Sequence, residues 1–130
     1  MEVNWLAVSA AALSSFLLGG VWYGALFGNA WMKAAGLTLE QAKGGNKALI
    51  FGGSFVLALI ASAMFATFLG PDINTLTGAL YGLAAGVCWV ATSYGISYLF
   101  ERRPLALWLI NGGYHAIQFT LIGAILGAWH

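Results

Sequence analysis

Charge is what this sequence lacks most. Only 7% of its 130 residues are charged, and five Lys and Arg residues nearly balance four Asp and Glu residues. A soluble domain carries about 25% charged residues, so a water-soluble globular domain is excluded. A formal net charge of +1 also excludes nucleic acid as a partner, because neutralising the phosphates requires a basic surface.

Cysteine and histidine are also scarce. The single cysteine, Cys88, cannot form an internal disulfide, and of the two histidines His130 ends the sequence. A zinc site needs three or four protein ligands, and a bis-histidine haem needs two imidazoles at matching depth. Nucleophilic catalysis would need a base and an orienting group, and no carboxylate lies within an apolar segment. We therefore predict no metal, no cofactor and no enzymatic activity.

Hydrophobic residues are abundant, at 61% of the chain. The charged residues fall in short clusters that separate four uncharged segments of at least 24 residues. Crossing a bilayer takes about 20 apolar residues as a helix. These segments are continuously apolar, unlike the alternating strands of a membrane barrel. The sequence predicts an all-α fold, an integral membrane bundle of four transmembrane helices in a single domain, 1–130, with spans of about 4–27, 48–70, 74–100 and 104–129.

The basic residues lie in only two of the links between these spans. They follow either the first or the third span, and these two links share one side of the membrane: Lys33, Lys43, Lys47, Arg102 and Arg103. Cytoplasmic loops are enriched in Lys and Arg. The distribution therefore predicts that both termini lie outside the cytoplasm.

The link after the first span is the one sizeable polar stretch. Thr38 followed by Gln41 three residues later has the pattern of a capping box, which begins a helix. We expect a short interfacial helix in this link, with Trp31, Met32 and Leu37 dipping into lipid. The run Gly44-Gly45-Asn46 should end it before the second span.

Glycines recur every fourth residue in three spans. Small residues at this spacing let two helices approach closely in lipid. One interpretation is packing within the bundle, and the other is self-association. We favour an oligomer, because four helices do not need three such ridges merely to close. The helix-packing glycines are Gly78, Gly82 and Gly86 in the third span and Gly123 and Gly127 in the fourth, with Gly20, Gly24 and Gly28 as the third ridge.

Two short motifs each occur twice. Leu-Ile-Phe-Gly-Gly at 49–53 resembles Leu-Ile-Asn-Gly-Gly at 109–113, and Gly-Val-Trp at 20–22 resembles Gly-Val-Cys-Trp at 86–89. Two repeated helical hairpins, related by an axis normal to the membrane, would produce this pattern. Chance similarity between apolar segments is the equal alternative. Trp89 falls near the middle of its span, and we expect it to pack inside the bundle.

The fourth span carries a polar face. Asn111, Tyr114, His115 and Gln118 fall within roughly 100° of arc on a helix, and polar groups at this depth are often functional. His115 is either a proton acceptor or ligand contact in a hydrated pocket, or a neutral imidazole bonded to Gln118 or a serine that fixes helix register. Asn111 has the character of a packing amide. We expect Thr92 to oppose this face, because it shares a face with Gly78 and Trp89.

Several of these segments resemble one known family. The motifs are Gly20-Val21-Trp22-Tyr23-Gly24, Phe27-Gly28, Ala30-Trp31-Met32-Lys33, Tyr98-Leu99-Phe100-Glu101, Asn111-x-Gly113-Tyr114-His115 and Gly123-Ala124-Ile125-Leu126-Gly127. They resemble the uncharacterised bacterial membrane protein family called domain of unknown function 1761 (DUF1761), over nearly the whole chain. The resemblance implies a four-span protein of the bacterial inner (plasma) membrane. It implies no activity.

Two functional hypotheses follow. The first is a homo-oligomer that binds or passes a small solute or proton through a midplane pocket lined by His115, Gln118 and Tyr114, with Asn111 and Thr92 beside them. One four-helix protomer is too thin to enclose such a path, so this hypothesis requires oligomerisation. The second is a non-catalytic accessory or scaffold subunit of a larger membrane complex. An enzyme acting on a lipid or quinone is the least favoured, because the catalytic partners are missing. Membrane lipid is the expected surrounding in each case.

Overall fold

The fold of this protein was analysed in a computed structural model, which describes residues 3–129 and contains only helices and connecting turns in that range. Four helical spans are long and apolar enough to cross a membrane: Trp5–Leu26, Lys47–Leu69, Thr75–Glu101 and Leu105–Ala128. Each end lies within one residue of the end expected from the sequence. The predicted all-helical class is confirmed, and the architecture is compatible with a multi-pass membrane protein.

Two of the spans are interrupted by a π-helical segment. The first span consists of α1 (Trp5–Gly20) and η1 (Val21–Leu26), and the third consists of α5 (Thr75–Ala85), η2 (Gly86–Ala91) and α6 (Thr92–Glu101). The second and fourth spans are the continuous helices α4 (Lys47–Leu69) and α7 (Leu105–Ala128). Both π-helices coincide with the Gly-Val-Trp and Gly-Val-Cys-Trp motifs. Such wide turns are rare and frequently mark functional sites.

Asparagine side chains begin three of the spans. The Asn4 Oδ1 atom accepts from the backbone amides of Leu6 and Ala7, both at 3.1 Å. Asn46 caps α4 and Asn74 caps α5 in the same way. These oxygens satisfy amides that the first helical turn leaves without a partner. The fourth span instead begins directly after Pro104, a residue that loses little at a helix start.

The polar link forms two short helices where the sequence predicts one. They are α2 (Gly28–Ala35) and α3 (Leu39–Lys43). Gly36 ends α2 with a φ of 74°, a left-handed conformation that suits glycine. The predicted capping box then begins α3: the Thr38 hydroxyl accepts from the Gln41 amide at 3.1 Å, and the Thr38 amide donates to Gln41 Oε1 at 2.9 Å.

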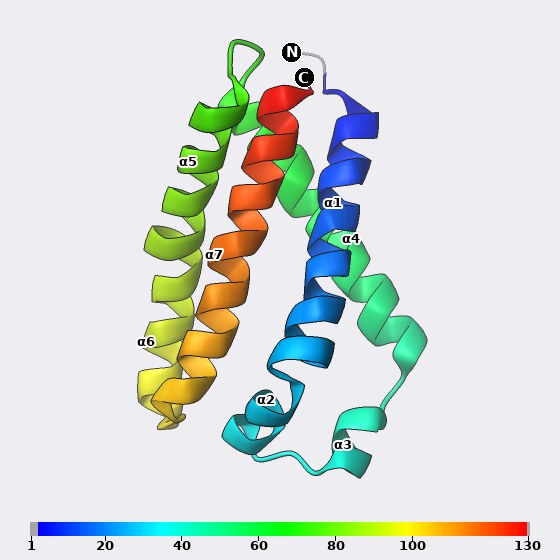
Figure 1. The fold of residues 1–130 in the computed structure, drawn as a ribbon, viewed down its shortest axis with the longest axis vertical. Helices are drawn as coiled ribbons and strands as arrows, with labels where there is room; N and C mark the ends of the chain where they lie inside the picture. Colours follow the sequence, from blue (N-terminus) through cyan, green and yellow to red (C-terminus); the bar gives the residue numbers. More distant parts are fainter. Residues whose placement is uncertain (1–2, 130) are drawn as a thin grey trace.

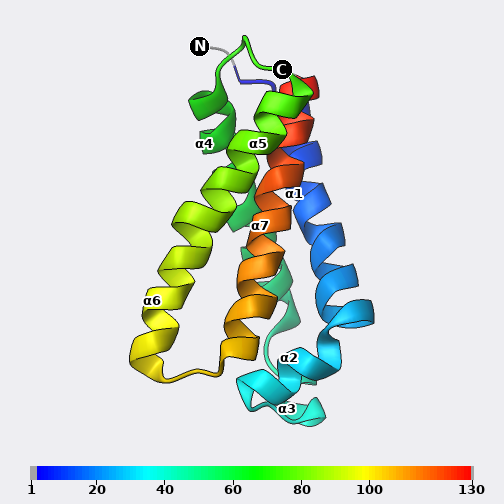
Figure 2. The same cartoon turned by 60° about the vertical axis from the view of Figure 1, so that its left-hand side comes forward.

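Helix α7 is the centre of the bundle. It lies between α5 and α1 (Figure 1), and α4 packs mainly on α1. The buried core joins small residues of α1 and α5 with larger residues of α4 and α7: Ala7, Val8, Ala11, Phe65, Ala85, Ile122 and Leu126. At the α2–α3 end of the molecule the helices spread apart. There α4 leans away from α1 (Figure 1), and α6 leans away from α7 (Figure 2).

The third and fourth spans are packed backbone against backbone. A Cβ atom added to Gly86 would lie 2.7 Å from the His115 carbonyl oxygen, and one added to Gly82 would overlap the Phe119 carbonyl. Gly123 lies in the same way on Gly78, and Gly127 lies on the backbone of Asn74. All five helix-packing glycines therefore pack within one chain. For these five glycines, the first of the two interpretations, packing within the bundle, is the one that the structure shows.

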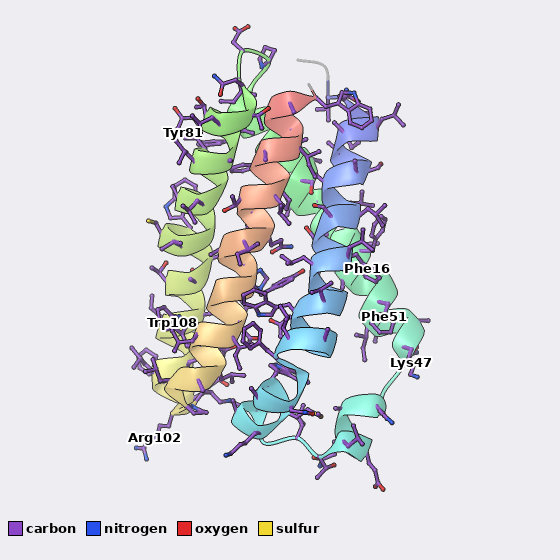
Figure 3. All side chains as sticks on the ribbon, in the orientation of Figure 1. Phe16, Lys47, Phe51, Tyr81, Arg102 and Trp108 are labelled. Carbon is purple, nitrogen blue, oxygen red and sulfur yellow. The ribbon has the colours of Figure 1, made fainter. Side chains whose placement is uncertain are left out.

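The two ends of the molecule differ in character. The start of α1, the end of α7 and the 70–74 loop lie together at one end, and α2, α3 and the α6–α7 turn lie at the other (Figure 1). Lys47 and Arg102 are both found at this second end (Figure 3). Here Arg103 donates from Nη1 to the Ala35 carbonyl at 3.4 Å. This contact ties the α6–α7 turn to the end of α2.

Trp89 does not pack inside the bundle as expected. Its side chain is 63% exposed, and its ring lies edge-on to Phe68 at 6.2 Å between centroids. The reason is η2. A π-helix bonds residue i to i+5, so each residue turns the chain by less than the 100° of an α-helix. Residues after Gly86 therefore leave the face on which Gly78 and Gly82 lie.

Candidate functional site

Polar side chains of α7 meet tyrosines from the first and third spans. We call this group the polar aromatic cluster. It consists of Tyr23 of η1, Tyr94 and Tyr98 of α6, and Asn111, Tyr114, His115 and Gln118 of α7. Three of the four spans thus contribute to one site, which lies where α7 meets η1 and α6.

Asn111 connects three spans through its amide. The Tyr23 hydroxyl donates to Asn111 Oδ1 at 2.6 Å, and Asn111 Nδ2 donates to the Tyr98 hydroxyl at 2.7 Å. An amide offers a donor and an acceptor at once, so it can bond two phenols on opposite sides. This geometry suits a packing amide.

His115 is held on three sides. Its Nδ1 atom lies 2.6 Å from Gln118 Oε1. Because an amide oxygen only accepts, Nδ1 carries the proton in this arrangement. The Tyr94 ring stacks on the imidazole at 5.1 Å with an interplanar angle of 16°, and the Tyr114 ring meets it edge-on at 4.9 Å. The ring orientation is therefore determined by its neighbours.

The second imidazole nitrogen has no such partner. His115 Nε2 makes no hydrogen bond with any described residue. Yet within residues 3–129 the one enclosed side-chain polar atom without a partner is Ser62 Oγ. Nε2 is therefore not fully enclosed by the chain, and with the proton on Nδ1 it presents a lone pair as an acceptor. The side chains of His115 and Tyr94 are half-buried, and Gln118 is buried.

Contacts around the cluster align α7 with its neighbours. The Tyr114 hydroxyl donates to the Ser15 carbonyl of α1 at 2.9 Å. Trp22 of η1 donates from Nε1 to the Ile110 carbonyl at 2.9 Å, and Trp108 donates to the Ala91 carbonyl of η2 at 2.8 Å. Each π-helix is thereby bonded to α7 beside the cluster, which places Tyr23 and Tyr94 against it.

The structure brings together four of the five predicted pocket residues. Asn111, Tyr114, His115 and Gln118 lie in the cluster, and the predicted His115–Gln118 contact is present. The placement of Thr92 was wrong. Its side chain is exposed, and its hydroxyl donates to the Cys88 carbonyl of its own helix at 2.7 Å. The wide turn of η2 rotates Thr92 away from α7, and a threonine in a helix readily bonds the preceding turn.

Three cluster residues were missed as site residues from sequence. Tyr23 follows the first Gly-Val-Trp motif, while Tyr94 and Tyr98 are four residues apart and so share one helix face. That spacing of two phenols inside a span was the available signal. No group of three or more His, Cys, Asp or Glu residues suited to a metal occurs among residues 3–129.

Comparison with known proteins gives a family and no activity. No curated protein and no solved structure matches the chain. The family model described as "Protein of unknown function (DUF1761)" matches residues 6–127. Because this match covers nearly the whole chain, the protein belongs to the DUF1761 family.

Proposed function

We propose that this is a multi-pass membrane protein that binds a small solute or a proton at His115 and, as a homo-oligomer, passes it through the membrane. The observation that carries the proposal is the state of the imidazole. Gln118 orients it through Nδ1, two tyrosine rings contact it, and Nε2 has no hydrogen-bond partner among the described residues.

This arrangement suits the acceptance of a hydrogen. Histidine changes charge near neutral pH, and a hydrogen bond at one ring nitrogen determines the chemistry of the other. Ionisable groups inside a span are costly and usually functional. The cluster contains no carboxylate and no Lys or Arg. A ligand therefore has to be a proton or a small neutral molecule that donates a hydrogen bond to Nε2.

Partial exposure of the cluster supports an oligomer. His115, Tyr94 and Tyr98 are only half-buried in one chain, although they belong to spans long enough to lie within the hydrocarbon layer. Polar side chains at that depth avoid lipid and face protein or water. A second copy packed against the half-buried cluster would complete its enclosure.

The test is a pH titration of the ¹⁵N-labelled histidines in lipid nanodiscs by NMR. The chain contains two histidines, so a His130→Gln variant leaves His115 as the one signal. We expect its Nε2 resonance to respond to bulk pH. In proteoliposomes with a pH-sensitive dye, His115→Gln should slow proton entry, while Thr92→Val should not. If the His115 resonance does not titrate and His115→Gln does not slow proton entry, a proton is not the ligand. The proposal is then contradicted altogether unless a neutral solute shifts the same resonance.

An accessory or scaffold role is the second candidate. It is favoured by the hydrogen bonds of Asn111 and Tyr114, which join α7 to η1, α6 and α1 as packing contacts would. A purely structural cluster would predict an inert imidazole and a loss of stability in His115→Gln. The titration therefore separates the two candidates.

We further propose a location in the bacterial inner membrane with both termini outside the cytoplasm. The support is the distribution of charge. Lys33, Lys43, Lys47, Arg102 and Arg103 belong to α2, α3, the start of α4 and the α6–α7 turn, at the end opposite the start of α1 (Figure 1). Basic residues are enriched on the cytoplasmic side of membrane proteins.

A further inference from the structure

The repeated motifs meet once inside the chain. Trp22 belongs to the Gly-Val-Trp motif and lies over Gly113 of the Leu-Ile-Asn-Gly-Gly motif. A Cβ added to Gly113 would lie 3.1 Å from the Trp22 ring. The same indole donates to the carbonyl of Ile110, two residues before the glycine pair. The missing side chains of the glycines make room for the ring.

The second copies of the two motifs, at 86–89 and 49–53, make no such contact within the chain. Trp89 is 63% exposed, and its indole N–H makes no hydrogen bond with any residue from 3 to 129. In the Leu-Ile-Phe-Gly-Gly motif, a Cβ added to Gly52 or to Gly53 would meet no atom of another part of the chain within 4 Å. The chain thus presents a tryptophan whose indole N–H has no partner and a glycine pair with nothing packed on it, the same two features that meet elsewhere in the chain.

One chain cannot bring these two surfaces together. Trp89 already lies against Phe68, near the other end of α4. Gly53 and Phe68 are separated by 15 residues of continuous helix, which is about 22 Å. Moving Gly53 to Trp89 would require α4 to slide by most of its length. The partner for each surface therefore has to come from another chain.

The position of Trp89 in its span favours a protein partner over lipid. Tryptophan is enriched at the membrane interfaces, where its N–H finds polar groups. Trp89 instead lies near the middle of the span Thr75–Glu101, where lipid offers no acceptor. A backbone carbonyl beside a glycine pair supplies both an acceptor and space for the ring, as Ile110 and Gly113 do for Trp22.

We propose that Trp89 of one copy packs over Gly53 of a second copy, repeating between chains the contact that Trp22 and Gly113 make within one. The acceptor equivalent to the Ile110 carbonyl is the Ile50 carbonyl. In the single chain it accepts a hydrogen bond from the Ser54 hydroxyl at 2.6 Å, and this bond would break when Trp89 binds. Because the two surfaces differ, the contact forms twice in a two-fold dimer or once per subunit in a ring. The inference rests on other residues than the polar aromatic cluster and goes beyond the proposed function.

The native Cys88 allows a direct test. It is the single cysteine of the chain, it is exposed and it precedes Trp89. The full chain with Gly53→Cys, reconstituted in lipid, should form a covalent dimer on mild oxidation, and adding Cys88→Ser should abolish that dimer. Mixing a tagged Gly53→Cys/Cys88→Ser chain with the unmodified chain should give a disulfide between the two.

Gly20→Cys is the matched control, because Gly20 is exposed and, like Gly53, has no neighbouring atoms where a side chain would begin. It should crosslink only at the level of random collision. Trp89→Ala should convert the oligomer to monomer in mild detergent while leaving its helical content unchanged. The proposal is overturned if Gly53→Cys crosslinks no more than Gly20→Cys, if its disulfide closes within one chain, or if Trp89→Ala leaves the mass unaltered. None of these outcomes depends on proton entry, so failure here is distinct from failure of the proposed function.

Discussion

The two helix pairs of this protein are built differently. Helices α5 and α7 lie against each other through glycines on both sides, so that backbone meets backbone. Near one end α1 contributes the small residues Ala7 and Ala11 to the core. At the other end Phe16 of α1 contacts Phe51 and Phe55 of α4, at about 6 Å between ring centroids; Phe16 and Phe51 are labelled in Figure 3. The rings hold the backbones apart, and α4 splays there. In lipid, where apolar surface alone drives no association, the size of the residues at the contact decides how closely two helices pack.

The largest expected effect comes from filling the tight interface. Gly82→Leu places a side chain where the Phe119 carbonyl lies, and overpacking of this kind costs about 3 kcal/mol or more. Gly20→Leu on α1 is the control, because nothing lies near that position. Its expected effect is a stabilisation below about 1 kcal/mol, since leucine favours helix more than glycine does.

Unfolding by SDS titration in mixed micelles measures both variants. The contrast between the helix pairs would be contradicted if the two substitutions cost the same free energy of unfolding, or if Gly20→Leu proved the more destabilising.

A smaller loss should follow from Asn111→Leu. This change removes the acceptor for Tyr23 and the donor for Tyr98. Hydrogen bonds between membrane helices average about 0.6 kcal/mol each, so the two together amount to about 1 kcal/mol. Thr92→Val is the control, because its hydroxyl bonds its own helix. A stability of Asn111→Leu equal to that of the control would show that the amide does not join α7 to its neighbours.

The smallest expected effect has the opposite sign and lies on the α1–α4 side. Ser62 of α4 is fully buried and its hydroxyl has no partner. An unsatisfied buried hydroxyl costs about 1 kcal/mol, so Ser62→Ala should raise the midpoint of SDS unfolding. Ser15→Ala is matched in burial, but Ser15 bonds the Ala11 carbonyl, and this change should not stabilise. If Ser62→Ala destabilises the protein, the Ser62 hydroxyl makes a hydrogen bond that contributes to the packing of α4.

Much of the fold was predictable because its signals are local or compositional. The positions of the charged residues located the four spans, and Thr38 with Gln41 located α3. The polar face of α7 followed from helical periodicity, which holds because α7 is a regular α-helix from Leu105 to Ala128. The positions of Trp89 and Thr92 were wrong for the converse reason. They lie in or just after η2, where the α-helical period fails, and no apolar pattern marks the change to i to i+5 bonding.

The partners in the cluster were harder to predict than its α7 face. That Tyr23, Tyr94 and Tyr98 converge on Asn111 and His115 depends on how closely α5 approaches α7 and on the direction in which η1 turns. These are tertiary features. Sequence spacing places Tyr94 and Tyr98 on one face, but it does not say which helix that face meets.

The wide turn η2 has a consequence for the chain's tolerance of length changes. Gly-Val-Cys-Trp exceeds Gly-Val-Trp by the single residue Cys88. Deleting that residue would leave an apolar segment still long enough to cross a bilayer, and hydropathy would register no difference. A turn bonded i to i+5 holds about one more residue than an α-helical turn, so the shortened segment can close as a regular α-helix, with α6 turned little relative to α5 and with Tyr94 and Tyr98 still facing α7. Deleting one residue from η2 should therefore be tolerated better than deleting one from the middle of α7, where no wide turn absorbs the change and the later residues turn by about 100°.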